Sequence, residues 1–466
     1  MQSRADELLA DTLPLTVGQR QAGFGELLWV QSGLAIGTWS LLIGGITAAY
    51  VGFWDGLWAM LFGGFIGTIP MMLATALPAN KWGAEHYVVQ RGIYGALGVK
   101  ILIVPTTLMG VGWIAILATM LSEYTVKIAG HFAPQQAQSS SILASCTSIV
   151  SLVACGLVVI RGEKAVARLN RLSAPSLIVV CGFLIWKIFT HGSTVTLAST
   201  HALTTQPSRA HGVMLALELN VACGMSWWSL AANVSRSAKT SRIALWAGIV
   251  GYVPVAVLAQ VIGLLSAHTL RSWDPPQWGV DTWHPVEQGV LLVFVWIANV
   301  TSIAAVAYSS TLTVVQHFGV RLQRSGWKRV STLILAVSGA VVLLFGVQFY
   351  QAFFTFTAWT QALLAPAIGI TLVDYYLLRK GELDLASLYN LDSQGAYFFW
   401  RRTNWVALTG VLVGAAVYVT MLNPVTLSSA TAFDYVTASG PSLLAAAMVH
   451  LLLTRLIVVR AGKGGY

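Results

Sequence analysis

A pair of hydroxyl residues and a few tryptophans are the side chains of this chain best suited to bind a ligand. Thr301 and Ser302 are neighbours in an apolar stretch, where their oxygens could coordinate a hard cation such as Na⁺. Trp113 follows a Gly-Val-Gly triplet, and Trp227 and Trp228 follow a Cys-Gly-Met-Ser run. Facing indoles can hold a flat heterocycle, since aromatic stacking adds about 0.5–1.5 kcal/mol beyond burial. Helix packing and interhelical hydrogen bonding remain alternative roles for each residue.

Glu218 is the only acidic residue that we place well inside an apolar segment. A charge at membrane depth is costly and usually marks a cavity or an ion path. The alternative is a residue near the outer end of its helix, and both interpretations stay open. The amides of Gln31, Asn220, Asn299 and Gln361 could meet a polar ligand or join helices to one another.

The composition indicates a membrane protein. Of 466 residues, 56% are hydrophobic and 9% are charged, and the mean hydropathy is +0.71. A soluble protein carries about 25% charged residues, so the composition excludes a soluble enzyme, a disordered scaffold and a nucleic-acid-binding protein. The four cysteines lie far apart in apolar runs, which predicts neither a disulfide framework nor a zinc site.

About twelve apolar segments are long enough to cross a bilayer, which needs roughly 20 residues per helix. We expect an all-α polytopic protein with spans near residues 27–46, 56–78, 99–121, 142–160, 174–191, 212–233, 243–266, 288–312, 329–347, 349–373, 404–421 and 441–459.

The basic residues predict the orientation of these spans. With the N-terminus inside the cell, 23 of the 27 Lys and Arg residues fall on the cytoplasmic side. This asymmetry follows the positive-inside rule. We therefore expect a multi-pass protein of the cell inner (plasma) membrane with both termini in the cytoplasm.

Two spans look interrupted, and each would open a block of five. The first carries Gly33, Gly37 and Thr38, and the sixth carries the run that ends at Ser226. Interrupted helices at corresponding positions are typical of inverted five-plus-five repeats with a midplane binding site. The expected organisation is a cytoplasmic tail (1–24), a first repeat (25–192), a second repeat (212–378), a cytoplasmic loop (379–403) and two appended helices with a short tail (404–466).

Several motifs resemble the nucleobase–cation symporter-1 family of purine, cytosine, hydantoin and allantoin permeases. They are Val373-Asp374-Tyr375-Tyr376-Leu377-Leu378-Arg379-Lys380, then Leu388-Tyr389, Tyr397 and Trp400-Arg401-Arg402-Thr403-Asn404-Trp405-Val406-Ala407, together with Lys81-Trp82-Gly83, Arg91-Gly92-Ile93-Tyr94-Gly95, Ser226-Trp227 and Ser235-Arg236. The resemblance implies a leucine-transporter-like inverted repeat with two appended helices. It also implies secondary active transport by alternating access, driven by Na⁺ or H⁺.

The resemblance assigns site residues by position. Trp113 matches the tryptophan that stacks on the substrate. Trp227 matches the aromatic residue on the other side, with Gly224 as the alternative. For the sodium site, Thr301 and Ser302 match the hydroxyl pair, and Ala298, Thr38 and Leu41 match the residues that supply backbone carbonyls.

The chain departs from the family at three positions. Leu117, Leu42 and Ala307 stand where hydantoin permease has glutamine, glutamine and asparagine. Amides there would pair with the ring's N–H and C=O groups, and unpaired site groups strongly penalise a wrong substrate. The departures argue against hydantoin itself. The polar role could pass to Gln31, Asn299, Glu218 or Ser226.

The sequence thus predicts a symporter that imports a nucleobase (purine or pyrimidine, such as cytosine) or a related heterocycle. The alternative is a symporter of the same fold for an amino acid or a cationic amine. We expect no catalytic residues and no cofactor beyond transported Na⁺ or H⁺, because the histidines are scattered and neither HExxH nor GxSxG occurs. The expected partners are the substrate, the coupling cation and lipid, and the expected functional form is a monomer.

Overall fold

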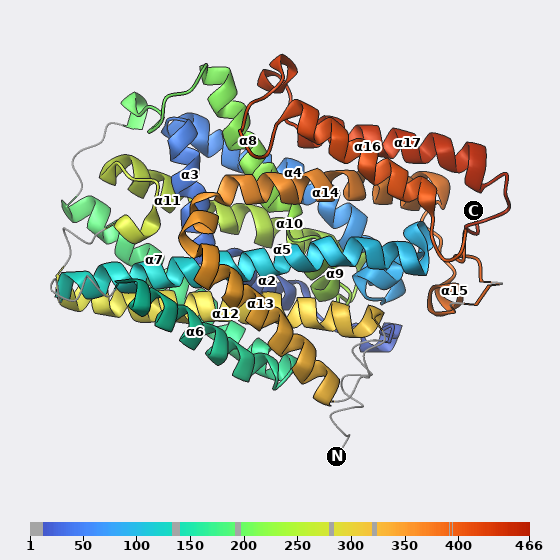
Figure 1. Cartoon of the computed structure of the whole chain (residues 1–466), viewed down its shortest axis with the longest axis horizontal. Helices are drawn as coiled ribbons and strands as arrows, with labels where there is room; N and C mark the ends of the chain where they lie inside the picture. Colours follow the sequence, from blue (N-terminus) through green and yellow to red (C-terminus); the bar gives the residue numbers. More distant parts are fainter. Residues whose placement is uncertain are drawn as a thin grey trace.

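The computed structural model describes residues 13–132, 140–191, 197–278, 284–318, 324–390, 392–393 and 395–466. Over these residues the protein is an all-helical bundle in which long helices such as α5 and α12 run close to parallel or antiparallel (Figure 1). The short helix α15 and the last residue lie near the same end of the long helices (Figure 1). We call this the α15 end.

The helices follow one another with short connections. The first half of the chain forms η1 (Val17–Gln19), α2 (Phe24–Ala35), α3 (Thr38–Tyr50), α4 (Phe53–Trp82), α5 (His86–Phe132), α6 (Ser140–Val159), α7 (Glu163–His191) and η3 (Leu197–Ser199). The second half forms α8 (Arg209–Met225), α9 (Trp228–Ser235), α10 (Ser241–Val250), η4 (Gly251–Val255), α11 (Ala256–Leu270), η5 (Pro275–Gln277), α12 (Pro285–His317), α13 (Arg324–Gln351), α14 (Phe353–Leu372), η6 (Val373–Leu378), α15 (Leu385–Tyr389), α16 (Trp405–Met421), η7 (Thr431–Asp434), α17 (Ser439–Leu453) and η8 (Thr454–Val458).

These helices occupy the predicted membrane spans. Within the described residues, eight helices are long and apolar enough to cross a membrane. Two bent pairs, α2–α3 and α8–α9, coincide with the first and sixth predicted spans, and the shorter apolar helices Ile178–Thr190 and Trp405–Met421 coincide with the fifth and eleventh. The prediction of an all-helical polytopic protein is confirmed.

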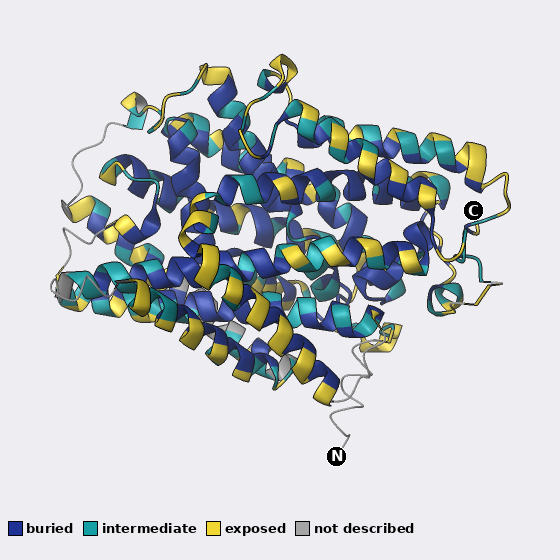
Figure 2. Ribbon diagram, viewed as in Figure 1, coloured by how far each residue is buried: buried dark blue, intermediate teal, exposed yellow. Residues whose placement is uncertain are grey.

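Exposed side chains on the outer helices are largely apolar, as the scarcity of charge requires. Leu344 and Phe345 on α13, Leu258 on α11 and Leu412 on α16 are each more than half exposed. Figure 2 shows exposed residues along the outer sides of these helices, while the inner helices are mostly buried. Such an apolar exterior suits lipid, which imposes no penalty on exposed hydrocarbon.

The predicted interruption of the first span is confirmed. α2 and α3 meet at an angle of 57°. Gly37 has extended backbone between them, and a Cβ there would lie 2.1 Å from the Trp39 ring. The Ser40 hydroxyl donates to the Ala35 carbonyl at 2.8 Å, which satisfies one backbone group that the break would leave unpaired.

The sixth span is also broken, at Ser226 and Trp227, where α8 and α9 meet at 40°. α8 packs along α4, and α3 packs along α11. Both interruptions therefore lie inside the bundle, where free backbone and polar groups are tolerated if they face a cavity.

The motif segments meet one another at the α15 end. α5 is kinked at Gly95, whose φ of 76° lies in the left-handed region that favours glycine. Asn404 closes this kink, because its side-chain amide donates to the Ile93 carbonyl at 2.7 Å and its backbone N–H donates to the Tyr94 carbonyl at 2.8 Å. Arg379 donates to the Gly92 carbonyl at 2.6 Å. Three motifs that are far apart in sequence thus form one structural unit.

Candidate functional site

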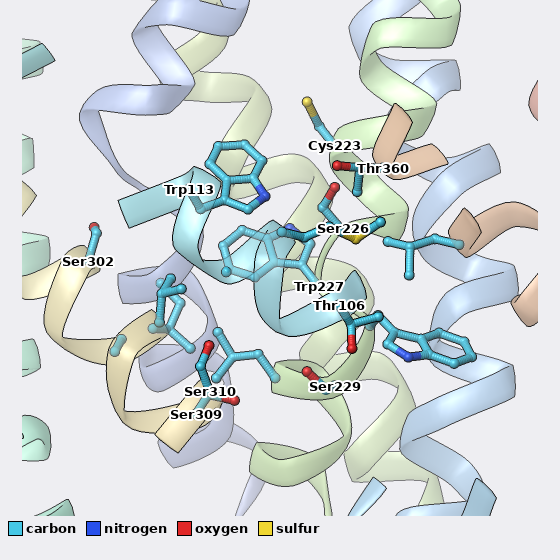
Figure 3. A pocket seen from close by; sticks show the side chains of 18 of the residues that line it. Thr106, Trp113, Cys223, Ser226, Trp227, Ser229, Ser302, Ser309, Ser310 and Thr360 are labelled. Atoms are coloured by element: carbon cyan, nitrogen blue, oxygen red, sulfur yellow. The ribbon is translucent and has the colours of Figure 1, made fainter. Parts of the chain in front are cut away.

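One cavity lies between the two helix breaks, bounded by α3, α5, α9, α12 and α14. It encloses about 970 Å³ of empty space, including its open mouth. Its aromatic lining consists of Trp39, Tyr87, Trp113, Trp227 and Trp228. Figure 3 shows Trp113 and Trp227 projecting into it from α5 and from the break before α9.

Three indoles lie together in the cavity, and Trp39 contacts each of the other two at a steep angle. Trp39 contacts Trp113 at a centroid distance of 6.3 Å and 76°, and it contacts Trp227 at 5.4 Å and 61°. Tyr252 stacks on Trp227 at 4.6 Å and 20°, so one face of that indole is covered. No second parallel ring covers Trp227 among the described residues.

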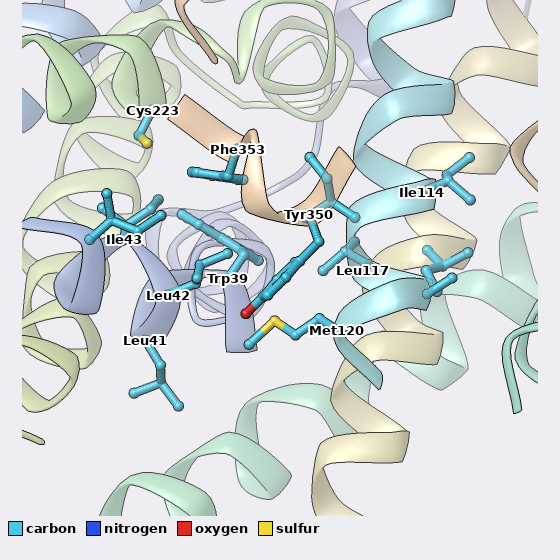
Figure 4. Packing of buried hydrophobic residues seen from close by; sticks show 14 of the residues in the cluster. Trp39, Leu41, Leu42, Ile43, Ile114, Leu117, Met120, Cys223, Tyr350 and Phe353 are labelled. Atoms are coloured by element: carbon cyan, nitrogen blue, oxygen red, sulfur yellow. The ribbon is translucent and has the colours of Figure 1, made fainter. Parts of the chain in front are cut away.

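Trp113 is oriented by two phenyl rings of α14. Phe353 and Phe356 each meet it edge-on, with centroids 5.6 Å away. Figure 4 shows Trp39 and Phe353 within the packed cluster that surrounds this region. No parallel ring covers Trp113 among the described residues. Both of its π faces therefore remain without a stacked partner.

The polar groups of the cavity are hydroxyls turned toward their own helices. Ser226 donates to the Ala222 carbonyl at 2.7 Å, Thr360 to Phe356 at 2.9 Å, and Thr106 to Leu102 at 3.0 Å. Each such hydroxyl uses its proton within the helix. Ser226 and Thr360 keep their lone pairs for another partner, whereas Thr106 already accepts the Tyr87 hydroxyl at 2.7 Å. In this arrangement they are hydrogen-bond acceptors.

A second group of oxygens lies where the start of α3 touches α12. The Thr38 hydroxyl donates to Oδ1 of Asn299 at 2.9 Å. On α12 the Ser302 hydroxyl donates to the Ala298 carbonyl at 3.1 Å, and Thr301 donates to Ile297. Thr38, Asn299, Thr301 and Ser302 offer only neutral oxygens at this contact, a ligand type that suits a hard cation.

The predicted site residues divide between these places and others. Trp113, Trp227, Ser226 and Leu117 line the cavity, and Ser302 lies on its wall toward α3. The backbone of Leu41 lies against α11, where a Cβ on Gly263 would be 2.3 Å from the Leu41 carbonyl oxygen. Leu42 and Ala307, which stand at positions that carry amides in hydantoin permease, are buried and do not line the cavity.

The structure places Gly224 and Gln31 outside the cavity. Gly224 faces α4, and a Cβ there would lie 2.9 Å from the Thr68 nitrogen, so its role is close helix packing. The Gln31 amide donates to the Ser235 hydroxyl at 3.1 Å and joins α2 to α9. Neither residue lines the cavity, which corrects their expected place beside the substrate.

Glu218 is also placed away from the cavity. Its carboxylate accepts a hydrogen bond from the Ser439 hydroxyl at 2.5 Å and from the Ser439 backbone N–H at 3.2 Å. These bonds tie α8 to the first turn of α17, and the two partners are 221 positions apart in the sequence. The buried charge is therefore accounted for by a structural contact with an appended helix.

Sequence reasoning missed Trp39 and the far wall of the cavity. Trp39 follows the Gly37-Thr38 break directly, so the argument from membrane depth that singled out Trp113 applied equally to it. Tyr87, Ser309 and Ser310 also line the cavity. They lie toward the helix ends, where no sequence pattern distinguishes them from packing residues.

Comparison with known proteins identifies the family. A protein family described as permease for cytosine/purines, uracil, thiamine and allantoin matches residues 16–437. The chain belongs to this nucleobase–cation symporter-1 family. It is thus a transporter rather than an enzyme, as predicted.

Individual relatives are distant. The chain is 25% identical to a purine-uracil permease of Arabidopsis thaliana over 433 residues, which is 87% of this chain and 69% of the relative. It is 30% identical to a hydantoin permease of Microbacterium maritypicum over 195 residues, which is 40% of this chain and 37% of the relative.

Solved structures of family members share the fold. Mhp1, a nucleobase-cation-symport-1 transporter, matches in a closed conformation with bromovinylhydantoin bound, with a TM-score of 0.75, 19% identity, and 97% and 96% of the two chains covered. Inward-facing Mhp1 matches with a TM-score of 0.76, 18% identity, and 96% and 94% covered. A more distant match is MhsT in complex with L-phenylalanine, with a TM-score of 0.54, 11% identity, and 94% and 98% covered. The expected leucine-transporter-like fold is confirmed.

Proposed function

We propose that this permease imports a flat nucleobase-type heterocycle together with Na⁺ by alternating access. The observation that supports this most strongly is the cavity at the junction of the two helix breaks, lined by the indoles of Trp113 and Trp227. Stacking of a base on an aromatic side chain is worth about 1–3 kcal/mol, so the two indoles together would supply most of the binding energy.

The hydroxyls of the cavity favour a substrate edge that carries N–H donors. Ser226 and Thr360 present lone pairs, because their protons are used by their own helices. Leu117 supplies no amide. An exocyclic amino group, as in cytosine or adenine, would be paired here, whereas the carbonyls of hydantoin would lack donors from these hydroxyls.

The lining also weighs against the alternative of an amino acid or a cationic amine. None of the residues that line the cavity, as the structure describes it, is charged. A charged group taken from water needs an opposite charge or strong hydrogen bonds to offset its desolvation. A largely neutral ring fits this lining better.

We place the coupling cation between α3 and α12. Thr301, Ser302 and the Ala298 carbonyl from α12 would supply oxygens, and the first turn of α3 would close the site with Thr38. The carbonyl of Leu41, which the resemblance also assigned to this site, faces Gly263 on α11 instead. The Thr38–Asn299 hydrogen bond supports this placement, since it joins the two helices at this level. The same bond places Oδ1 of Asn299 at the proposed site, where it could be a further oxygen ligand of the cation.

We further propose that the α15 end faces the cytoplasm, with both termini there, in the inner (plasma) membrane. Arg379, Lys380, Arg401 and Arg402 flank α15 in the sequence, and the segments expected on the cytoplasmic side carry 23 of the 27 Lys and Arg residues, in line with the positive-inside rule. Residues 25–192 and 212–378 would act as the two repeats that rock around the cavity, with residues 404–466 as a support, in a monomer.

An uptake panel tests the substrate proposal. Purified protein is reconstituted in proteoliposomes, and uptake of radiolabelled cytosine, adenine, uracil, hydantoin and allantoin is measured with an inward Na⁺ gradient and with choline in its place. We expect cytosine or adenine to accumulate with Na⁺ and hydantoin to accumulate least. Accumulation of none of the five, or preference for hydantoin, would contradict the proposed class.

The cation site is tested by Thr301→Ala combined with Ser302→Ala. The double variant should lose Na⁺-driven uptake of the accumulated base, because two of the proposed ligands are gone. Thr420→Ala on the exposed side of α16 is the matched control, since this hydroxyl likewise donates to its own helix. Sodium dependence that survives in the double variant would refute the site.

A further inference from the structure

Glu85 is a completely buried acid outside the cavity, in the short link between α4 and α5. Its Oε2 accepts the backbone N–H groups of Tyr87 at 2.8 Å and Val88 at 3.1 Å, and it lies 3.1 Å from Nε2 of His317 on α12. Its Oε1 is also buried, with no hydrogen-bond partner among the described residues. A buried carboxylate oxygen without a partner is costly, so this atom is available for a ligand.

The protonation state of His317 follows from its neighbours. Its Nδ1 lies 3.2 Å from a guanidinium nitrogen of Arg91. Arginine only donates, so Nδ1 must accept and carries no proton. The ring proton is then on Nε2 and is donated to Glu85. His317 is therefore a neutral connector between Arg91 and an ionised Glu85.

This polar cluster lies directly beside the cavity at the α15 end. The ring of His86 contacts Tyr87 at 4.8 Å and Trp228 at 4.5 Å, and both of these residues line the cavity. The His86 backbone N–H donates to the side chain of Asn233 on α9 at 3.2 Å. The link that carries Glu85 thus joins α9 on one side to α12 on the other.

We propose that Oε1 of Glu85 is a proton-binding site that couples protonation from the α15 side to separation of α9 from α12. The proton comes from solvent and binds to the unpaired lone pair of Oε1, so no existing hydrogen bond is broken in the binding step. It neutralises the carboxylate and weakens the bonds from His317 and the two backbone N–H groups, since hydrogen bonds to charged acceptors are the stronger ones.

The surrounding charges define the electrostatics of the site. His86 and Arg91 face Glu85 from α5, His317 faces it from α12, and Tyr389 acts on it from α15. Lys100 also acts on His317, and Arg236 on Tyr389. Burial raises the pKa of Glu85, but the hydrogen bonds from His317 and from the Val88 N–H hold this pKa below its ordinary value.

The direction of the pH effect follows from these opposed contributions. In the present arrangement the depressed pKa keeps Glu85 ionised at neutral pH, and this contribution to stability is lost only as pH falls through the depressed value. When α12 withdraws, burial remains and the hydrogen bond from His317 is lost, so the pKa rises and the carboxyl binds a proton more readily. The separated arrangement binds more protons, and acid therefore favours it.

A distance measurement without any substrate tests this coupling. Nitroxide labels are placed at Lys239, which follows α9, and at Phe318, which follows α12, because both side chains are exposed. The four native cysteines are replaced, and double electron–electron resonance is recorded in nanodiscs from about pH 8 to about pH 5. We expect the longer distance to gain population as pH falls, with a ratio that changes by up to about tenfold per pH unit.

Variants distinguish Glu85 from other titrating groups. Glu85→Gln should show the longer distance at every pH. His317→Gln should keep the pH dependence, because the glutamine amide can still donate to Glu85. Glu382→Gln is the matched control, since this exposed acid pairs with Lys81 on the same side, and it should behave as wild type.

Three results would overturn the proposal: wild-type distances that do not change with pH, an unchanged pH dependence in Glu85→Gln, or loss of the pH dependence in His317→Gln. The last result would make His317 the titrating group. The experiment contains neither substrate nor Na⁺, so its failure is distinct from failure of the proposed transport function.

Discussion

Replacing Trp113 by alanine should weaken substrate binding far more than it changes the fold. Trp113 lines the cavity, and no ring stacks parallel to it among the described residues, while Phe353 and Phe356 lie at steep angles to it with centroids 5.6 Å away. The loss for a bound base is one stacking interaction, about 1–3 kcal/mol. Because 1.4 kcal/mol corresponds to a factor of ten, the dissociation constant should rise by about 5- to 150-fold.

The assay is equilibrium binding of the radiolabelled base that accumulates most in the uptake panel, on purified protein with saturating Na⁺. Trp113→Phe should lose less affinity, because a smaller aromatic face remains. Trp246→Ala is the matched control, since that indole lies on α10 and is 52% exposed. A thermal unfolding curve for each variant separates loss of binding from loss of stability.

The reasoning would be refuted if Trp113→Ala bound the base as tightly as wild type, or if Trp246→Ala lost as much. Either result would mean that the indole faces in the cavity do not hold the ring. A fall in the unfolding temperature with unchanged affinity would assign Trp113 to packing alone.

Three further predictions follow from particular contacts. Gly37→Ala should reduce binding of the same base at least as much as Trp113→Phe, because the new Cβ would lie 2.1 Å from the Trp39 ring and displace it; unchanged affinity would contradict the packing of that break. Asp374→Asn should lower the free energy of unfolding by about 3–5 kcal/mol, because the buried carboxylate pairs with Arg379 at 2.6 Å and with His450 at 2.9 Å. Thermal unfolding measures this loss, and an unchanged unfolding temperature would contradict it. Glu218→Gln should lower the unfolding temperature, because it weakens the hydrogen bond with Ser439, and should leave the affinity for the base unchanged. A loss of affinity with an intact fold would show instead that Glu218 takes part in substrate binding.

The helices were predictable because lipid imposes a local rule. A span must be long and apolar, and a break needs glycine or small polar residues, so the interruptions near Gly37 and Ser226 were visible in the sequence. Trp113 and Trp227 both line the cavity, and the sequence indicated them for a similar reason, since each indole lies at mid-depth next to small residues rather than in the interfacial belt.

The misplaced residues depend on long-range packing, which no local pattern contains. The sequence showed that Glu218 was an acid in the membrane, but its partner Ser439 belongs to an appended helix far along the chain. Gln31 turned toward α9 for the same reason. The surroundings of Glu85 could not be predicted either, because only the fold brings His317 to its carboxylate.

The most direct test of the central claim is the reciprocal effect of Na⁺ and base on each other's binding. Affinity for the base with greatest uptake is measured in Na⁺ and in choline, and affinity for Na⁺ is measured with and without that base. The account predicts that each ligand tightens the other by the same factor, in the range of about 5- to 150-fold. Equal base affinity in Na⁺ and in choline would contradict it.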